Sequence, residues 1–597
     1  MMKKTLLAAL LATVSSTICA QNITSIYFIG DSLTDTGQLG SRFTTNPGNV
    51  WSYYFAEKNG LRADPSGQGG TNLAVGGARV SVNELADPTL PVGPSNPVLP
   101  AMTSQLEQLL AVKKGQLESD AIYSVWGGAN DLFAVVQDPL QAPMILMDSV
   151  VNQVGIIDSL HKHGARYILV GDIPDLGKTP EFAGIPVVSD IATLLSSTYN
   201  QGLALGLASS QANIIPLTIS GLLTEVMADP TTYGFSNVTD AACSTSSLYC
   251  GPAQLVSADA DQTHLYADGV HPSSKAHQAI AQYADAVFSA GTVVGMLGAT
   301  ANQAGLSQMQ RIDRRLSLTQ ANTEQGVQVW AEGAALFSNG SHERSQVHGT
   351  NGSGSLGISK QVNQWTMGTY LHYDRIDSTL SSSSLQQKRF AGGLYGRWAD
   401  ANTWVNAQFY YADLDTRLDR HVDIGAAHRD HHSKAKGHQA GGRISAGYNW
   451  QHGSVTHGPL LGLNLQKAKI KALAEQATSS SSMRFAAQTQ NSLQSSLGYQ
   501  LSVAVNPDWS VYASAQWLHE FKKANKEVGA GMQTGLYSDR AFYLPTQTKL
   551  AKNTGVFELG ASGRLTKQWD VNAGISMQTA NAPNAQNSVY LGTAYRF

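Results

Sequence analysis

The hydrophobic and polar positions follow different patterns in the two halves of the chain. Up to about residue 300, short apolar runs such as AIYSVWGG (121–128) and YILVGD (167–172) alternate with segments of helical spacing such as HQAIAQYADAVF (277–288). Alternating strands and helices are typical of an α/β fold with a mostly parallel sheet. We therefore predict a parallel sheet flanked by helices over residues 21–300.

From about residue 330 the pattern alternates with a period of two, and turn residues separate the segments. In WTMGTYLHY, one face carries Trp365, Met367, Thr369, Leu371 and Tyr373. In TWVNAQFYY, the polar face carries Asn406 and Gln408. A soluble antiparallel sheet would alternate in the same way. The length of this region and the aromatic residues near its strand ends favour a transmembrane antiparallel β-barrel over 329–597, with its apolar face against lipid.

The last strand and the segment before the barrel refine this prediction. The chain ends SVYLGTAYRF, and its C-terminal Phe597 resembles the outer-membrane insertion signal of bacterial barrels, which implies outer-membrane lipid and the barrel-assembly machinery as partners. Residues 301–328 include a helical pattern that is too polar to cross lipid, since it contains Arg311, Arg314 and Arg315. This segment is either a helix inside the barrel lumen or a solvated linker helix.

Composition limits the classes that remain. A chain of 597 residues is too long for one hydrophobic core, so at least two domains are expected. The net charge of -3 gives no basic surface for nucleic acid. Residues 1–20 have the pattern of a secretory signal peptide, with Lys3 and Lys4 before an apolar stretch, and we place cleavage after Ala20. Lipidation at Cys19 is the alternative.

Three other features suggest local structure. Cys243 and Cys250 are seven positions apart in an exported chain and suit a small disulfide loop, with two free thiols as the alternative. The serine runs at 381–384 and 479–482 suggest flexible loops. HRDHHSKAKGH (428–438) could bind metal, but we interpret it as a solvated loop between strands.

The chemistry is suggested by IYFIGDSLTDTGQ (26–38), where an apolar run ends at Gly30-Asp31-Ser32. A serine is a useful nucleophile only when a base removes its proton and an acid orients that base. YADGVHPSSKAHQAIA (266–281) supplies such a pair, Asp268 and His271, three residues apart. The Gly76-Gly77 pair and the Asn130 amide are candidate donors to an oxyanion. Each of these pieces alone could instead be a turn or a helix cap.

Together, GDSLTDTG, NLAVGGA, GGAND and DGVHP resemble the ordered blocks of the GDSL, or SGNH, family of serine esterases and lipases. The resemblance covers residues 25–290 and implies the SGNH-hydrolase fold with Ser32 as nucleophile, His271 as base and Asp268 as its partner. It implies an oxyanion hole made by the Ser32 N–H, the Asn130 side chain and the N–H of Gly77, with Gly76 one position away. Asp31 and Asp35 are interpreted as loop-ordering groups. No metal or organic cofactor is implied.

With the barrel added, the chain resembles the autotransporter subgroup, in which a GDSL passenger is joined through a helix to a barrel that usually has twelve strands. YGFSNVTDAAC (233–243) also resembles a segment of these enzymes, whereas Ala267 stands where relatives often have a bulky aromatic, a role that Tyr266 could fill. The resemblance implies a monomer in the bacterial outer membrane, with a surface-exposed passenger that hydrolyses fatty-acyl esters, lysophospholipids among them. The alternatives are a surface adhesin with incidental esterase activity and a porin-like channel.

Overall fold

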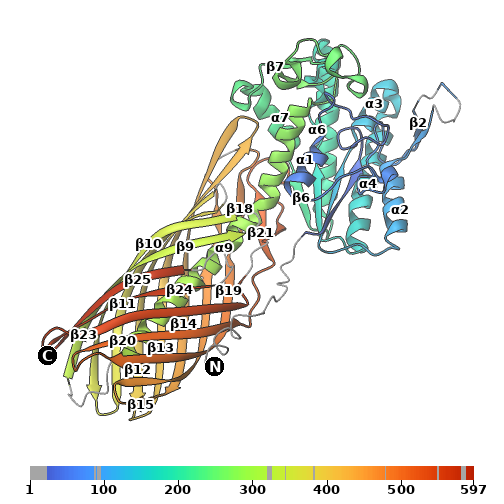
Figure 1. Ribbon diagram of the computed structural model, residues 1–597. Helices are drawn as coiled ribbons and strands as arrows, with labels where there is room; N and C mark the ends of the chain where they lie inside the picture. Colours follow the sequence, from blue (N-terminus) through green and yellow to red (C-terminus); the bar gives the residue numbers. More distant parts are fainter. Residues whose placement is uncertain are drawn as a thin grey trace, which may run out of the picture.

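The computed structural model describes residues 23–597, except 87–88, 91–95, 319–325, 343–344, 381–382, 477–478, 547–549 and 580–585. An α/β domain and a β-barrel are joined by one long helix (Figure 1). The predicted signal peptide, residues 1–20, lies outside the described residues.

The α/β domain is built on a four-stranded parallel sheet in the order β1-β4-β5-β6, and the strands are β1 Ser25–Gly30, β4 Ala121–Trp126, β5 Tyr167–Gly171 and β6 Ile214–Leu217. The strands are buried almost throughout, as expected for a parallel sheet covered on both faces. The helices of this domain are α1 Trp51–Lys58, α2 Met102–Val112, α3 Ala129–Gln137, α4 Ala142–Lys162, α5 Pro180–Ala183, α6 Pro186–Ala208, α7 Ile219–Ala228 and α8 Ala260–Thr263. The predicted α/β fold is confirmed.

Within the described residues, twelve long strands form the barrel, and they are β9 Gly326–His342, β10 Ser345–Val362, β11 Trp365–Leu380, β12 Ser383–Ala399, β13 Thr403–Ile424, β14 Ala427–Tyr448, β16 Val455–Ile470, β19 Gln488–Ala504, β20 Trp509–Glu520, β23 Asn553–Arg564, β24 Trp569–Gln578 and β25 Gln586–Arg596. The first strand of the barrel, β9, pairs with the last, β25. The short β15 (Trp450–His452) lies between β14 and β16 in the chain, and β14 pairs directly with β16. The antiparallel sheet therefore closes on itself. Closure satisfies the backbone hydrogen bonds that lipid cannot satisfy. The predicted barrel is confirmed.

The two faces of the barrel differ as the alternation predicts. Trp365, Met367 and Leu371 are exposed on the outside, whereas Asn406 and Gln408 are buried inside. In the last strand, the exposed apolar side chains are those of Val589 and Leu591, and Phe597 follows them. The outer surface is therefore apolar and suited to lipid, and the inner surface is polar.

The helix α9, Ser274–Leu318, runs from the α/β domain into the barrel (Figure 1). Its 45 residues span about 68 Å at about 1.5 Å per residue. In the lumen, Arg314 donates to Glu332 at 3.0 Å and Asp313 accepts from Arg443 at 3.0 Å, so charged groups on the helix are paired with charged groups on the barrel wall. The interpretation as a lumen helix is confirmed, and that as a solvated linker is wrong. The helical segment predicted at 277–288 and the part of the predicted 301–328 segment up to Leu318 belong to this one element, which crosses residue 300 without a break. Residues 319–325 lie outside the described residues.

Within the part of the chain that the structure describes, two helices are long and apolar enough to cross a membrane by length and composition, Pro139–Lys162 and α9. The first contains α4, which packs in the α/β domain, and the second lies largely in the barrel. The barrel strands are therefore the elements that cross the membrane.

Extensions of the barrel strands hold the α/β domain. A small sheet of β17 Leu473–Ala474, β18 Met483–Phe485, β21 Glu527–Met532 and β22 Phe542–Pro545 lies between the two parts. The side chain of Asn213 exchanges two hydrogen bonds with the backbone of Tyr543, at 2.9 and 2.7 Å, and Arg166 forms an ion pair with Glu527. Asn213 directly precedes β6 and Arg166 directly precedes β5. The amino ends of the parallel strands therefore face the barrel, and their carboxyl ends face away from it.

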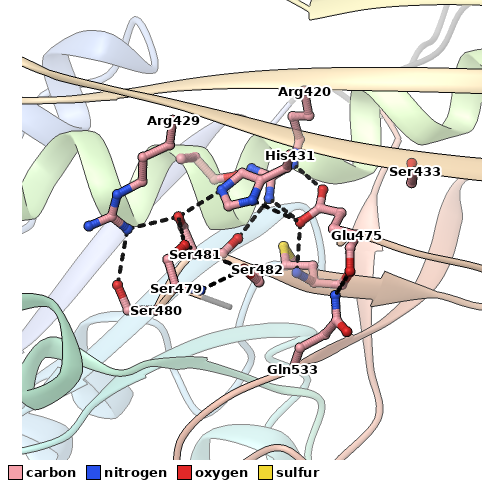
Figure 2. A network of polar contacts seen from close by, with 12 residues as sticks. Arg420, Arg429, His431, Ser433, Glu475, Ser479, Ser480, Ser481, Ser482 and Gln533 are labelled. Carbon is pink, nitrogen blue, oxygen red and sulfur yellow. Dashed lines mark hydrogen bonds and ion pairs between the residues drawn. The ribbon is translucent and has the colours of Figure 1, made fainter. Parts of the chain in front are cut away.

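A buried polar network supports this junction (Figure 2). Arg420 forms two hydrogen bonds with Glu475, at 2.7 and 2.8 Å, and His431 lies 2.9 Å from the Ser481 hydroxyl. Residues 479–482 form a loop between β17 and β18 as predicted, but Ser480, Ser481 and Ser482 are buried, so the loop is packed rather than flexible. In the other serine run, residues 381–382 lie outside the described residues and Ser383 begins β12. Residues 428–438 lie in β14 rather than in a loop, because β13 and β14 extend beyond the other strands to reach the α/β domain. Arg429 forms an ion pair with Glu225 of the α/β domain, and the Ser480 N–H donates to the same carboxylate, so each segment makes a contact across the junction.

Candidate active site

The site forms at the carboxyl ends of the parallel strands, where open α/β sheets bind ligands. Ser32 follows β1, and Asn130 lies in the first turn of α3, which begins three residues after β4 ends. The turn after β1 is fixed by the Gln105 amide, which accepts from the Gly30 N–H and donates to the Gly30 carbonyl, both at 2.9 Å. Gln105 is 75 residues from Gly30, and no local pattern indicated this contact.

The structure brings Ser32, His271 and Asp268 together. The Ser32 hydroxyl lies 2.9 Å from His271 Nε2, and His271 Nδ1 lies 2.9 and 3.0 Å from the two oxygens of Asp268. The ring of Phe43 packs beside the imidazole, with 5.0 Å between ring centres. The imidazole is thus held between a hydroxyl and a carboxylate, with one ring nitrogen toward each.

Asp268 is held by further donors. Its Oδ1 accepts from the N–H groups of Val270 and His271, at 3.0 and 2.9 Å, and its Oδ2 accepts from the Ser247 N–H at 2.8 Å. Burial alone would raise the pKa of Asp268, but the hydrogen bonds and the electrostatic interaction with His271 outweigh it and hold that pKa well below its ordinary value. Asp268 is therefore ionised at neutral pH and ready to orient the imidazole.

The disulfide loop supplies the Ser247 donor. Cys243 and Cys250 form a disulfide, with 5.9 Å between their Cα atoms, and Ser247 lies within the loop that they close. The loop is also tied to the segment after Ser32, because Asn46 donates to the carbonyls of Ser247 and Cys250, at 3.0 and 2.9 Å. The two cysteines are thus linked to the Asp268 carboxylate through Ser247, a residue that the sequence did not single out because a backbone N–H has no residue signature.

The candidate oxyanion donors differ in how they are engaged. The Gly76 N–H donates to Asp35 at 2.9 Å, whereas the N–H groups of Ser32 and Gly77 have no acceptor among the described residues. Gly77 has a φ of +80°, a backbone conformation that favours glycine. Asn130 donates one amide hydrogen to the Ala78 carbonyl at 2.9 Å and has a second to offer. These contacts favour Gly77 over Gly76.

The two aspartates beside Ser32 have different surroundings. Asp35 accepts from the N–H groups of Gly37, Gln38 and Gly76, so it fastens the Ser32 loop to the glycine pair. Asp31 is buried, and this burial raises its pKa to about 7. Its Oδ1 accepts from the Leu33 N–H at 3.0 Å. These contacts agree with a loop-ordering role for both residues.

A small pocket opens at Ser32, with a cavity volume of about 30 Å³. Ser32, Asn130 and His271 line it, whereas Gly77 is not among its lining residues. The apolar part of the lining comes from side chains on several elements, which are Leu33, Phe133, Leu176, Leu223, Tyr266 and Val270. Tyr266 thus lies at the pocket next to the small Ala267, as the sequence suggested. The lining therefore places apolar side chains beside the Ser32 hydroxyl and the Asn130 amide.

Comparisons with known proteins agree with both halves. Residues 26–284 match the family described as GDSL-like Lipase/Acylhydrolase, and residues 329–576 match the Autotransporter beta-domain. The chain is a GDSL-type ester hydrolase carried on an autotransporter barrel. The chain is 24% identical to Lipase 1 of Photorhabdus luminescens over 98% of each protein. It is 25% identical to Esterase EstA of Pseudomonas aeruginosa, over 94% of this chain and 88% of that protein.

Two further similarities cover part of the chain. Phosphatidylcholine-sterol acyltransferase of Aeromonas hydrophila is 28% identical over 43% of this chain and 76% of its own length. The translocator domain of the autotransporter NalP from Neisseria meningitidis is similar over 52% of this chain and all of its own, with 17% identity and a TM-score of 0.43. This GDSL autotransporter therefore lies in the bacterial outer membrane with its passenger exposed at the surface, and the comparisons do not favour the adhesin alternative.

Proposed function

We propose that Ser32, His271 and Asp268 are the catalytic triad of this ester hydrolase. The observation that carries the proposal is the continuous chain of contacts of 2.9–3.0 Å from the Ser32 hydroxyl through the imidazole to the carboxylate. His271 Nε2 takes the hydroxyl proton as Ser32 Oγ attacks the acyl carbonyl. The imidazolium then protonates the departing alcohol, and an acyl-enzyme forms on Ser32. Water, deprotonated by the same imidazole, releases the acid.

We assign the oxyanion hole to the N–H groups of Ser32 and Gly77 and to the Asn130 side chain. The proposal is supported by two backbone donors without an acceptor among the described residues and by the second hydrogen of the Asn130 amide. Donors fixed in this way stabilise the charge that develops on the carbonyl oxygen without reorganising at the moment of reaction. The hydrogen bond from the Asn130 side chain to the Ala78 carbonyl holds the Asn130 amide in one orientation. It uses one of the two amide hydrogens and leaves the other to donate to an oxyanion.

The substrate we propose is a fatty-acyl ester, with lysophospholipids among the candidates. The apolar pocket lining beside Ser32 suits an acyl chain. The names of the relatives, which include a lipase, an esterase and an acyltransferase, agree with acyl-ester chemistry. Transfer of the acyl group to an alcohol instead of water would use the same acyl-enzyme.

The test is hydrolysis of p-nitrophenyl esters of graded chain length by intact cells that display the wild type, Ser32→Ala or the control Ser209→Ala. Ser209 is an exposed serine at the end of α6, so its hydroxyl is not expected to matter. We expect activity in the wild type and in Ser209→Ala and none in Ser32→Ala, with equal display measured by antibody. Equal activity in all three would refute the assignment of Ser32.

We further propose that the chain is a monomer inserted by the barrel-assembly machinery. Pairing of β9 with β25 and of β14 with β16 supports the first point, since one chain suffices to close the barrel. The exposed Phe597 after an apolar outer face of β25 supports the second. The boundaries at residues 20, 300 and 328 remain predictions. Light scattering of the purified chain, corrected for detergent, should give the mass of one copy.

A further inference from the structure

The α/β domain carries an apolar surface that no described part of the chain covers. Its exposed side chains lie on α3, α4, α6 and the turn between α3 and α4, and they are Val136, Leu140, Met144, Met147, Val151, Val187, Ile191, Leu194 and Leu205. We call this set the apolar face. Leu140 is 94% exposed, Met147 67% and Leu194 64%. Scattered apolar residues are normal on a surface, but a contiguous patch marks an interaction site.

The apolar face is contiguous because its two main helices run side by side. Gly202 of α6 lies against Val150 of α4, and Gly206 lies against Val154. Contacts that advance by four residues along both helices show that α4 and α6 run parallel to each other. On α4, Met144, Met147 and Val151 recur at intervals of three and four, and Leu140 extends the same row by one turn toward α3. The exposed residues of α6 follow the same spacing on its outer side. Two apolar rows therefore flank one helix–helix contact.

The apolar face begins at the pocket beside Ser32. Phe133 lines that pocket and stacks on Phe182, with 6.1 Å between ring centres. Val136 is one helical turn after Phe133 and is exposed. On the other side, Ile185 follows Phe182 and is also exposed, just before α6 begins. An acyl chain leaving the pocket at Phe133 would therefore meet apolar side chains rather than water.

The charges of these segments limit the partner. Residues 136–157 contain only the acids Asp138 and Asp148, and residues 182–208 contain only Asp190, with no lysine or arginine in either segment. A surface for anionic lipid or nucleic acid would need basic residues. The apolar face also has no Trp, Tyr or Arg, the residues that carry most of the binding energy at protein interfaces. Uncharged, flexible Met, Leu, Ile and Val side chains suit a lipid surface.

We propose that the apolar face docks on the surface of a zwitterionic phospholipid aggregate outside the cell and passes its acyl esters to Ser32. The inference rests on the proposed function, because it names the physical form of the substrate for the same site. The membrane that holds the barrel is not the source, since the pocket lies at the carboxyl ends of the strands and the barrel at their amino ends. The apolar face then has two tasks, binding the lipid surface and shielding the acyl chain on its way to the pocket.

The experiment measures the capture of fluorescent phosphatidylcholine vesicles by cells that display the full chain. All chains carry Ser32→Ala so that hydrolysis does not alter the vesicles. The test variant combines Met147→Glu with Leu194→Glu, and the conservative variant combines Met147→Leu with Leu194→Met. Val112→Glu is the matched control, because Val112 is 71% exposed on α2 and lies outside the apolar face. We expect the two glutamates to reduce capture by about tenfold or more, and the other two variants to retain it.

Equal capture by the test variant and Val112→Glu would overturn the proposal, as would capture that requires anionic lipid. Light scattering that finds two copies of the wild type and one of the test variant would overturn it in favour of a dimer interface. With Ser32 restored, the test variant should hydrolyse dissolved p-nitrophenyl butyrate at the wild-type rate and vesicle-borne esters more slowly. Failure of the wild type to hydrolyse the dissolved ester would refute the proposed function, whereas vesicle capture would still decide the docking.

Discussion

Replacing Ser247 with proline should remove one hydrogen bond to the triad carboxylate and little else. Ser247 is the first residue of a short 3₁₀ helix, Ser247–Tyr249, and the residue before it is extended, with a φ of -53° and a ψ of 140°. Proline is well tolerated at a first helical position and after an extended residue. The substitution puts a ring carbon where the Ser247 N–H meets Asp268 at 2.8 Å, so the donor is lost and the carboxylate has to shift.

The expected loss follows from the charge on Asp268. A hydrogen bond to a charged group contributes about 1.5–3 kcal/mol. If that stabilisation acts fully on the orientation of His271, kcat/KM falls roughly 10- to 100-fold, since about 1.4 kcal/mol corresponds to a factor of ten. The pKa of Asp268 should also rise, because a backbone N–H that donates to its charged form is gone. The acid limb of the pH–rate profile should therefore move to higher pH.

The assay is kcat/KM for p-nitrophenyl butyrate across pH, with Ser247→Ala as the control. Ser247→Ala keeps the N–H and removes a buried hydroxyl that has no partner among the described residues, so it should retain activity. A thermal melt of both variants checks that the disulfide loop remains folded. If Ser247→Pro matched Ser247→Ala in rate and pH profile, Asp268 would not depend on the loop, and the argument would be wrong.

The remaining predictions concern three other sites. Asn130→Ala should lower kcat by roughly 10²–10³ with little change in KM, as expected for loss of an oxyanion donor, and steady-state kinetics would show it. The pKa of Asp31 is about 7 in the folded passenger and 3.8 in the unfolded chain, so Asp31 holds its proton more tightly when the passenger is folded. The free energy of unfolding should therefore fall as pH rises through this range, by at most about 4 kcal/mol. Asp31→Asn should abolish that decline, measured by urea unfolding at about pH 5 and about pH 8; a decline of the same size in the variant would show that Asp31 is not its cause. Glu475→Ala should destabilise the junction by about 3–5 kcal/mol, because it leaves the buried Arg420 without its ion-pair partner, and a large rise in the rate of proteolysis between the two parts would detect it.

The elements that could be predicted from the sequence are those with a local pattern. The barrel follows from a period of two that decides which face meets lipid, and the outward Trp365 and inward Asn406 agree with it. Asp268 and His271 could be paired because only two residues separate them and a tight turn joins them. Ser32 could be added because an apolar strand ends beside it.

Other features could not be predicted because they depend on residues far apart in the chain. Gln105 fixes the turn at Gly30 across 75 residues, and Arg420 meets Glu475 across 55. The serines at 479–482 resemble a flexible loop in composition, and only the approach of Arg429 and the α/β domain makes them a buried network. Ser247 acts through its backbone, which is the same in every residue type except proline.

The helix α9 explains why the passenger and its anchor form one unit. It begins at Ser274, three residues after His271, and its first turns contribute Ile280, Tyr283 and Phe288 to the same buried cluster as β1 and β5. Its later turns pair with the barrel wall through Asp313 and Arg314. A break within this helix would expose unpaired backbone groups and remove part of the passenger's own core. His271, the hydrophobic core of the passenger and the membrane anchor are thus joined through a single element, so the geometry that holds the passenger at the surface also holds His271 beside Ser32.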